Sequence, residues 1–267
     1  MKEKYTINDL RHIVEKLRNP DTGCPWNLQQ SFASIAKFTL EEAYEVVDAI
    51  EHHDLKGLKG LKGEVGDLLY HVLYYSQLGQ EEALFSFDDV IQQLAEKLIQ
   101  RHPYIFGEIK LQSESEVIAA WQKQKSKERF ENHKKPAQHS ALDNIPNVFP
   151  ALVRAAKIQQ RAADVNFDFE EYKQALSKVY EEVDEVVAEA DAAVVDQAKL
   201  EEELGDLLFS VVNVTRHLKH DPEQALRKAN EKFEKRFRQV EVLALQNGKI
   251  LSDCSVEEME SFWQEVK

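Results

Sequence analysis

The sequence predicts an all-α protein built from two copies of one helical domain. Four short blocks of similar sequence recur in the same order, with similar spacing, in the two halves of the chain. Apolar residues in these blocks follow the spacing of one helix face, and no stretch alternates strictly between apolar and polar residues. Glycine (9) and proline (7) are both scarce, whereas an all-β chain needs more turn residues. Two tandem helical-bundle domains are therefore the expected architecture.

The first block is an acidic helix, at residues 40–47 in the first repeat and 180–187 in the second. Val179, Val183 and Val187 recur every four residues, which places them on one face of that helix. The acidic residues between them therefore lie beside an apolar stripe.

The second block, residues 63–70 and 202–209, predicts the next helix. Residues 207–214 are apolar on most sides, so we expect this helix to be central and well buried. Gly66 and Gly205 interrupt the helical pattern at a cost of about 1 kcal/mol each relative to alanine. Such glycines predict the close approach of a neighbouring helix or a ligand.

The last two blocks and a linker complete the organisation. Residues 96–101 resemble residues 231–236, and Trp121 corresponds to Trp263. Between the repeats the helical pattern fails, and prolines and mixed polar residues predict a linker. We place the first domain at residues 1–125, the Pro-containing linker at 126–147 and the second domain at 148–267.

The composition limits the classes of function. The formal net charge of −14 and the lack of a basic stripe argue against binding to nucleic acid. No apolar run is long enough to span a bilayer, and the first residues lead into no apolar signal segment. Cys24 and Cys254 stand in no metal-binding or redox spacing, which suits a reducing compartment. We therefore expect a cytoplasmic protein without a membrane partner.

Paired carboxylates are the strongest candidates for chemistry. Glu182 and Glu185 are three residues apart, as are Glu203 and Asp206 on the next helix, and both pairs flank an apolar stripe at the same angle. A single such pair is typical of an ordinary solvated face. The matched register on two helices, repeated in both domains, instead predicts a metal site. The equivalent residues of the first repeat are Glu42, Glu45, Glu64 and Asp67.

Clustered carboxylates repel one another unless a cation neutralises them. Their oxygen ligands favour Mg²⁺, with Mn²⁺ as a substitute, and Mg²⁺ commonly shares its coordination sphere with substrate phosphates. No glycine-rich phosphate loop is present, so phosphate binding has to rest on the metal and on basic side chains.

Basic and aromatic residues near the C-terminus supply candidate substrate contacts. Lys232 and Arg236 share one helix face and can clamp phosphate oxygens, although a surface charge pair would look the same. Lys97 and Arg101 repeat the pattern in the first domain. Trp263 can stack on a nucleobase or pack in a core. Tyr180 and Phe209 are expected in the core.

Two other classes of protein fit parts of this pattern. A di-iron carboxylate bundle also uses inward glutamates, but it needs Glu-x-x-His on two helices, and the third positions here are Glu185 and Asp206. The second alternative is a dimeric helical scaffold or regulatory nucleotide-binding protein without turnover. Such a scaffold predicts no stabilisation by Mg²⁺.

The double Glu-Glu-x-x-Glu and Glu-x-x-Asp pattern resembles the MazG nucleotide pyrophosphohydrolases, which are similar to the all-α dimeric dUTPases. The resemblance covers nearly the whole chain and includes Cys24-Pro25-Trp26, His102-Pro103 and the linker. It implies an all-α homodimer with a Mg²⁺-dependent activity on phosphorus anhydrides, of the ATP diphosphatase type. NTPs and dNTPs with varied bases would be cleaved to monophosphate and diphosphate, which implies nucleotide-pool cleansing or control.

The resemblance also implies roles for particular residues. The metal ligands fall on Glu182, Glu185, Glu203 and Asp206 and, in the first repeat, on Glu42, Glu45, Glu64 and Asp67. The implied nucleotide contacts are Lys178, Val179, Tyr180, Glu181, Glu182, Lys199, Leu200, Glu201, Glu202, Lys232, Arg236 and Trp263. Because Gly60 stands where the second repeat has Lys199, we expect the second domain to carry most of the activity.

The expected reaction is an in-line attack of water on the α-phosphorus. The metal activates the water, while Lys232 and Arg236 hold the charge of the leaving diphosphate. Glu181 or Glu202 is expected to accept the proton of the attacking water.

Overall fold

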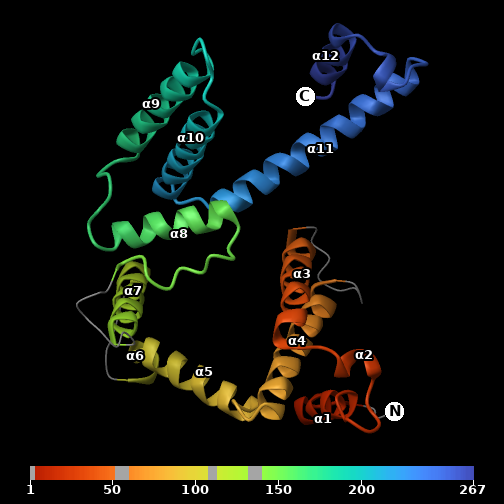
Figure 1. Ribbon diagram of the computed structural model, residues 1–267, viewed down its shortest axis with the longest axis vertical. Helices are drawn as coiled ribbons and strands as arrows, with labels where there is room; N and C mark the ends of the chain where they lie inside the picture. Colours follow the sequence, from red (N-terminus) through yellow and green to blue (C-terminus); the bar gives the residue numbers. More distant parts are fainter. Residues whose placement is uncertain (1–3, 52–59, 108–112, 132–139) are drawn as a thin grey trace. The chain divides into compact units, whose positions relative to one another are not determined.

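The computed structural model describes residues 4–51, 60–107, 113–131 and 140–267. All of its regular elements within these ranges are helices, which confirms the all-α prediction (Figure 1). None of the described helices combines the length and apolar character that a membrane span requires. The helices are α1 (Ile7–Leu17), α2 (Pro25–Leu28), α3 (Phe32–Glu51), α4 (Leu61–Glu81), α5 (Phe87–Arg101), α6 (Pro103–Phe106), α7 (Glu114–Glu131), α8 (Ala151–Ala163), α9 (Tyr172–Ala190), α10 (Gln197–His217), α11 (Pro222–Gln246), the 3₁₀ helix η2 (Leu251–Asp253) and α12 (Val256–Glu265).

The chain divides into two compact units, residues 1–132 and 133–267, and each unit contains one of the repeats. Helix α7 continues to Glu131, so the segment expected as a linker begins inside this helix. Residues 132–139 of that segment lie outside the described residues.

The centre of the first unit is the antiparallel pair α3 and α4. The hydroxyl of Thr39 on α3 lies 3.1 Å from Nδ1 of His71 and 2.7 Å from the hydroxyl of Tyr75, both on α4. Helix α1 packs against α4, where Val14 joins the buried core around Tyr74. This core lies toward the C-terminal half of α4 and leaves the acidic block of α3 at its edge.

The second unit repeats this arrangement with α9 and α10 as the central pair and α8 packed against α10. Asp196 caps α10 by accepting hydrogen bonds from the backbone of Ala198 and Lys199, which fixes where the helix begins. Helix α11 starts after a turn at Asp221 and leads away from the α9–α10 pair (Figure 1). Its distal part packs against α12.

Helix α10 is less buried than the sequence pattern predicts. Leu208 is 60% exposed and Val211 45% exposed, although both lie in the run expected to be well buried. Tyr180, expected in the core, is 65% exposed, and Phe209 is 41% exposed. The prediction was wrong for a single chain, because the helices of one unit are too few to cover every apolar side of the central pair.

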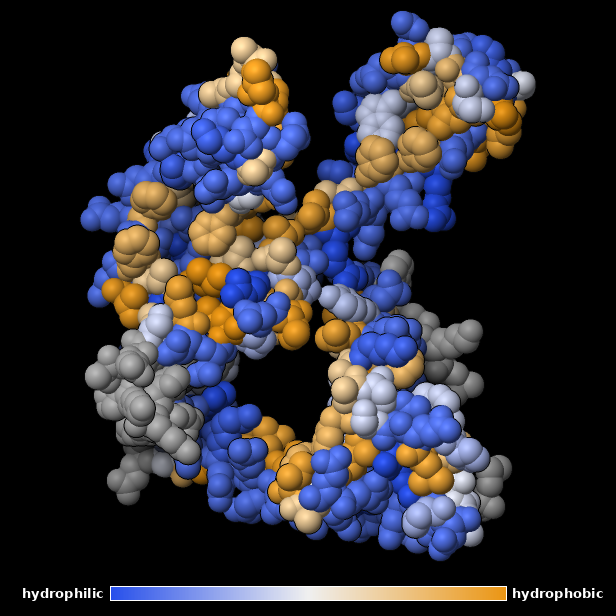
Figure 2. Space-filling view, viewed as in Figure 1, coloured by the Kyte–Doolittle hydropathy of each residue, from blue (hydrophilic) through white to orange (hydrophobic). Residues whose placement is uncertain are grey.

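An uncovered apolar face recurs in both repeats, and its positions match except that Tyr44 takes the place of Val183 one residue further along the helix. On α9 and α10 it comprises Tyr180, Val183, Val187, Leu204, Leu208 and Val211. On α3 and α4 it comprises Leu40, Tyr44, Val47, Val65, Leu69 and Val72. Figure 2 shows apolar side chains of this kind among charged ones on the visible face of the molecule. Contiguous exposed apolar surface of this extent is typical of an interface with another protein surface.

The two helical glycines make no close approach within the described chain. A Cβ atom added to Gly66 or Gly205 would meet no heavy atom within 4 Å. Both lie on the exposed side of the central helices, so the predicted close neighbour is not another element of the same unit.

Candidate metal and nucleotide site

Three of the four predicted carboxylates of the second repeat come together between α9 and α10. Glu182, Glu203 and Asp206 each offer a carboxylate oxygen, and these oxygens lie within 4.8 Å of one another. The i,i+3 spacing brings Glu203 and Asp206 to one side of α10, and the antiparallel packing brings Glu182 of α9 opposite them. Such a set of oxygens can hold a divalent cation.

Glu182 provides the strongest indication that this cluster binds a cation. Its side chain is 4% exposed, and Oε1 accepts from Nζ of Lys178 at 2.7 Å. The other oxygen, Oε2, is buried and has no hydrogen-bond partner among the described residues. Burying an unpaired carboxylate oxygen is costly, and a cation held by the three acids would remove that cost. The residues therefore fit a divalent metal.

Glu185, the fourth predicted ligand, borders this cluster without belonging to it. Burial raises the pKa of Glu185, and the negative charges of Glu182 and Glu203 raise it further. The shift shows that Glu185 senses the charges of the cluster.

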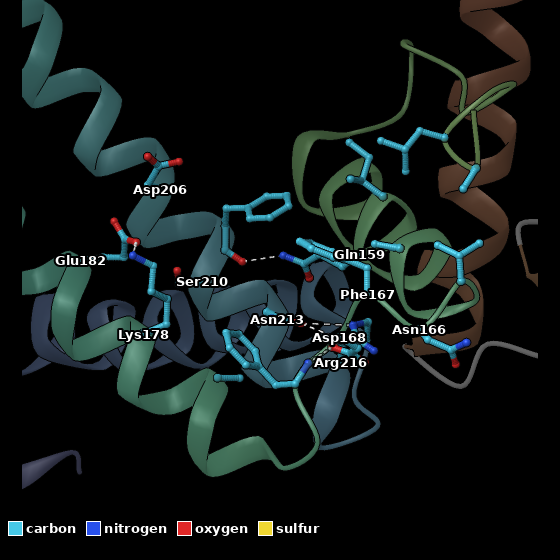
Figure 3. A pocket seen from close by; sticks show the side chains of 18 residues that line it. Gln159, Asn166, Phe167, Asp168, Lys178, Glu182, Asp206, Ser210, Asn213 and Arg216 are labelled. Atoms are coloured by element: carbon cyan, nitrogen blue, oxygen red, sulfur yellow. Dashed lines mark hydrogen bonds and ion pairs between the residues drawn. The ribbon is translucent and has the colours of Figure 1, made fainter. Parts of the chain in front are cut away.

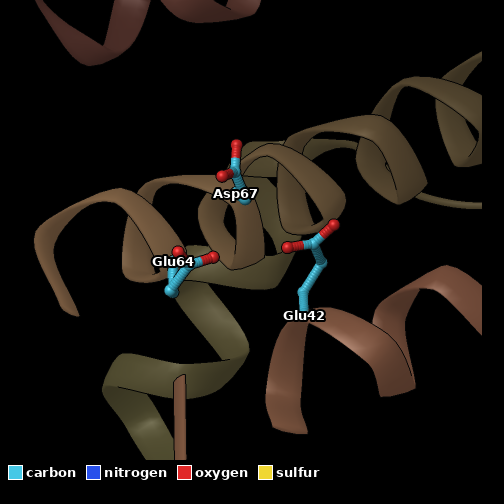
Figure 4. A group of neighbouring side chains, drawn as sticks. All are labelled: Glu42, Glu64 and Asp67. Atoms are coloured by element: carbon cyan, nitrogen blue, oxygen red, sulfur yellow. The ribbon is translucent and has the colours of Figure 1, made fainter. Parts of the chain in front are cut away.

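The first repeat contains the matching cluster of Glu42, Glu64 and Asp67, whose oxygens also lie within 4.8 Å of one another (Figure 4). Its surroundings differ. Phe38 stands four residues before Glu42, where the second repeat has Lys178 four residues before Glu182. On the other side, the buried His71 places Nε2 3.9 Å from Oε1 of Glu42, at the position of Ser210 in the second repeat.

The charges of the first cluster are therefore poorly compensated. Burial raises the pKa of Glu42, and the neighbouring carboxylates of Glu45, Asp67 and Glu64 add to the shift. Burial lowers the pKa of His71, so its imidazole is neutral near pH 7 and does not offset the carboxylates. This cluster has no ammonium group in the place of Lys178.

The predicted nucleotide contacts of α9 and α10 flank the carboxylate cluster. Lys178 forms ion pairs with Glu181 at 2.9 Å and with Glu182 at 2.7 Å, and these contacts raise its pKa. Val179 is half-buried, and Tyr180 is exposed on the apolar face described above. The predicted contacts Lys199, Leu200, Glu201 and Glu202 lie within the first two turns of α10, before Glu203.

Lys232, Arg236 and Trp263 lie on other elements of the same unit. Lys232 and Arg236 lie midway along α11, beyond its contacts with α8 and α10 near its start. The Trp263 ring on α12 packs against Phe233, with a centroid distance of 5.3 Å. Helix α11, which carries Lys232 and Arg236, leads away from the α9–α10 pair, and α12, which carries Trp263, lies at its far end (Figure 1).

In the first repeat the arginine of the matching basic pair, Arg101, is already engaged. Arg101 donates to both carboxylate oxygens of Glu128 on α7, with the closest contact at 2.5 Å. The hydrogen bonds from Arg101 lower the pKa of Glu128, so the pair stays charged. A guanidinium committed to a carboxylate within its own unit is poorly placed to hold phosphate.

The structure also shows a cavity that sequence reasoning missed. It has a volume of about 820 Å³ and lies between α8, the segment at residues 165–169, α9 and α10. Lys178, Glu182 and Asp206 form part of its wall (Figure 3). Its other polar groups come from elements distant in sequence, so no local motif marks them.

Comparisons with known proteins agree with this geometry. The model of the MazG nucleotide pyrophosphohydrolase domain matches residues 30–106 and again residues 170–241. The chain is 51% identical to the nucleoside triphosphate pyrophosphohydrolase of Escherichia coli strain K12, over 98% of this chain and 97% of that protein. It is 38% identical to the nucleoside triphosphate pyrophosphohydrolase/pyrophosphatase MazG of Thermotoga maritima, over 100% of this chain and 98% of that protein. Both carboxylate clusters lie within the matched segments.

Proposed function

Because this chain belongs to the family of MazG nucleotide pyrophosphohydrolases, we propose that it cleaves nucleoside triphosphates with Mg²⁺ at Glu182, Glu203 and Asp206. The products are the monophosphate and diphosphate, from both NTPs and dNTPs. Glu185 completes the ligand set when the substrate is bound. Mn²⁺ can take the place of Mg²⁺, because the ligands are all carboxylate oxygens.

The single observation that carries this proposal is the buried Oε2 atom of Glu182 without a partner. Glu182 lies beside the carboxylates of Glu203 and Asp206, whereas the oxygens of an ordinary acidic helix face would lie in water. Lys178 compensates only one oxygen of Glu182. The second repeat therefore keeps a negative charge buried at the place where a cation would be most strongly stabilised.

When bound, the metal supplies charge neutralisation at the phosphates and activation of the attacking water. The side chains of the protein accept the proton of the attacking water and hold the phosphates. Of the two candidate proton acceptors, Glu181 is held in an ion pair by Lys178. Glu202 has no ion pair or hydrogen bond to the described part of the chain, so we assign the proton-accepting role to Glu202.

The proposed homodimer is supported by what one chain lacks. The apolar face of α9 and α10 is uncovered, and α11, which carries Lys232 and Arg236, leads away from this pair toward α12, which carries Trp263. A second copy packed on that face would bury it and could bring its own α11 toward the cluster. Lys232 and Arg236 of the partner subunit would then hold the diphosphate, where Arg offers bidentate contacts.

The first domain is proposed to bind metal without substantial turnover. Its carboxylate cluster is present, but Phe38 replaces the lysine, Gly60 stands in place of Lys199, and Arg101 is engaged by Glu128. The first two differences remove a positive charge from the place where a polyphosphate would lie, and in the third the charge of Arg101 is already offset by Glu128.

The competing function is a helical scaffold without turnover, and thermal melting separates the two. We expect saturating Mg²⁺ to raise the melting temperature of the wild-type protein, because a ligand of the folded state alone stabilises it by about 2.7 kcal/mol at 100 times its Kd. Glu182→Gln should remove much of this shift. Equal melting temperatures with and without Mg²⁺ would support the scaffold instead.

A further inference from the structure

The carboxylate cluster of the first repeat has a nitrogen donor beside it that the second repeat lacks. Glu42 on α3 and Glu64 and Asp67 on α4 place carboxylate oxygens within 4.8 Å of one another (Figure 4). His71 follows Asp67 by four residues, so its side chain leaves the same side of α4 one turn later. Its Nε2 atom lies 3.9 Å from Oε1 of Glu42. An imidazole nitrogen therefore borders the three carboxylates.

The imidazole of His71 is held in one orientation. Its side chain is 7% exposed, and its ring packs against the rings of Tyr70 and Tyr75, with centroid distances of 6.0 Å and 6.4 Å. Its other ring nitrogen, Nδ1, lies 3.1 Å from the hydroxyl oxygen of Thr39. That oxygen also lies 2.7 Å from the hydroxyl oxygen of Tyr75. The ring cannot turn without losing these contacts.

The same contacts assign the proton of the neutral imidazole to Nδ1. The Thr39 hydroxyl donates to the backbone carbonyl of Ile35 at 3.4 Å. Its oxygen then accepts from Nδ1–H of His71 and from the hydroxyl of Tyr75. Nε2 is left with a lone pair, and it forms no hydrogen bond to the described residues, because 3.9 Å to Glu42 is beyond hydrogen-bond reach. A nitrogen lone pair and a carboxylate oxygen thus face each other without a proton between them.

A transition-metal ion between these two atoms would resolve the arrangement. Bonds from Zn²⁺ to imidazole nitrogen and to carboxylate oxygen are about 2.1 Å long, so one ion can join atoms up to about 4.2 Å apart. The 3.9 Å between Nε2 of His71 and Oε1 of Glu42 lies within that span. Imidazole suits zinc, iron, nickel and copper ions, whereas Mg²⁺ prefers carboxylates and water. Proteins usually orient a metal-binding histidine through a hydrogen bond from its other ring nitrogen.

The second repeat lacks every part of this arrangement. The imidazole and the two hydroxyl groups that hold it are replaced there by Ser210, Val179 and Val214. The second cluster has instead the ammonium group of Lys178, 2.7 Å from Oε1 of Glu182. The nitrogen donor and the groups that orient it therefore occur together in the first repeat and are missing together from the second.

We propose that the first repeat holds a transition-metal ion of the Zn²⁺ class, bound by Nε2 of His71 together with the three carboxylates. The inference rests on the proposed binding of metal by the first domain, but not on nucleotide cleavage by the second. Four ligands from the protein close a tetrahedral site, which is typical of a structural ion. The ion ties α3 to α4 and differs in kind from the Mg²⁺ of the second repeat.

Zinc binding in the presence of excess Mg²⁺ tests this site. The full-length protein is stripped of metal with a chelator, supplied with excess Mg²⁺ to fill the second cluster, and titrated with Zn²⁺ by calorimetry. We expect about one Zn²⁺ to bind per chain. His71→Ser, which installs the residue of the second repeat, should weaken Zn²⁺ binding by about tenfold or more. His12→Ser is the matched control, because His12 is an exposed histidine outside the cluster, and it should leave the Zn²⁺ affinity unchanged.

Two further measurements guard against misfolding of the His71 variant. Thr39→Val copies Val179 of the second repeat and keeps the ligand itself, so it should weaken Zn²⁺ binding by about tenfold through loss of the orienting hydrogen bond. In the wild-type protein, ¹⁵N NMR of labelled histidine should show that Zn²⁺ shifts the Nε2 resonance of His71. That resonance is assigned by its absence from His71→Ser.

The outcomes separate this site from the proposed function. Unchanged Zn²⁺ affinity in both His71→Ser and Thr39→Val, or a His71 resonance that Zn²⁺ does not shift, would overturn the site. Complete displacement of Zn²⁺ by Mg²⁺ would indicate a site of carboxylate oxygens alone and would overturn it as well. A protein that binds Zn²⁺ through His71 but does not cleave ATP would contradict the proposed function and leave this site standing.

Discussion

The Glu182→Gln variant is expected to lose at least about a hundredfold in kcat/KM for nucleoside triphosphates. Glutamine keeps the shape of the side chain and can still accept from Lys178, but it removes the negative charge that faces Glu203 and Asp206. The metal-free variant should melt no lower than the wild type, because a buried unpaired carboxylate oxygen disappears. Steady-state kinetics with several NTPs measure the loss of kcat/KM. Thermal melts without metal measure the melting temperatures of the variant and the wild type.

Glu42→Gln is the matched control in the first repeat. Glu42 stands at the same position of the repeat, in a cluster of the same composition. Because that cluster lacks an equivalent of Lys178, we expect the variant to keep its turnover within about threefold of the wild type. Loss of activity in Glu42→Gln with activity retained in Glu182→Gln would reverse the assignment of the two domains.

Mixing two inactive variants is expected to restore activity. Glu182→Gln lacks the metal site, and a Lys232→Ala, Arg236→Ala double variant should lose about a hundredfold through the phosphate contacts. If each site joins the carboxylates of one subunit to the basic pair of its partner, every mixed dimer contains one intact site and one doubly defective site. Random exchange of subunits then restores about a quarter of the wild-type activity.

The same mixture distinguishes the arrangement within the dimer. If the carboxylates and the basic pair of one subunit formed a site together, both sites of a mixed dimer would carry a defect, and no activity would return. Size-exclusion chromatography with light scattering, before and after mixing, establishes that subunits exchange. Recovery without dimers in solution would contradict the shared site.

The metal cluster was predictable because its determinants are local. Spacing of three residues fixes Glu203 and Asp206 on one side of α10, and the apolar stripes dictate how α9 meets α10. The duplication was equally visible, because the acidic blocks recur in order. Both features can be predicted from helix geometry and one packing contact between helices.

The cavity beside the carboxylates was not predictable for the opposite reason. Gln159 lies on α8, Asp168 precedes α9, and Asn213 lies on α10, so that only tertiary packing brings them together. Each residue alone is an ordinary polar residue of a helix or loop. The apolar run at residues 207–214 predicted that another protein surface covers α10. The periodicity of the sequence does not indicate whether that surface belongs to the same chain or to another.

The position of the cut tests the central claim most directly. Purified protein is incubated with ATP and Mg²⁺, and the phosphorus products are resolved by ³¹P NMR. The account predicts AMP and diphosphate, with no ADP, and no products from Glu182→Gln over the same time. ADP with orthophosphate would contradict attack at the α-phosphorus, even if the same carboxylates hold the metal.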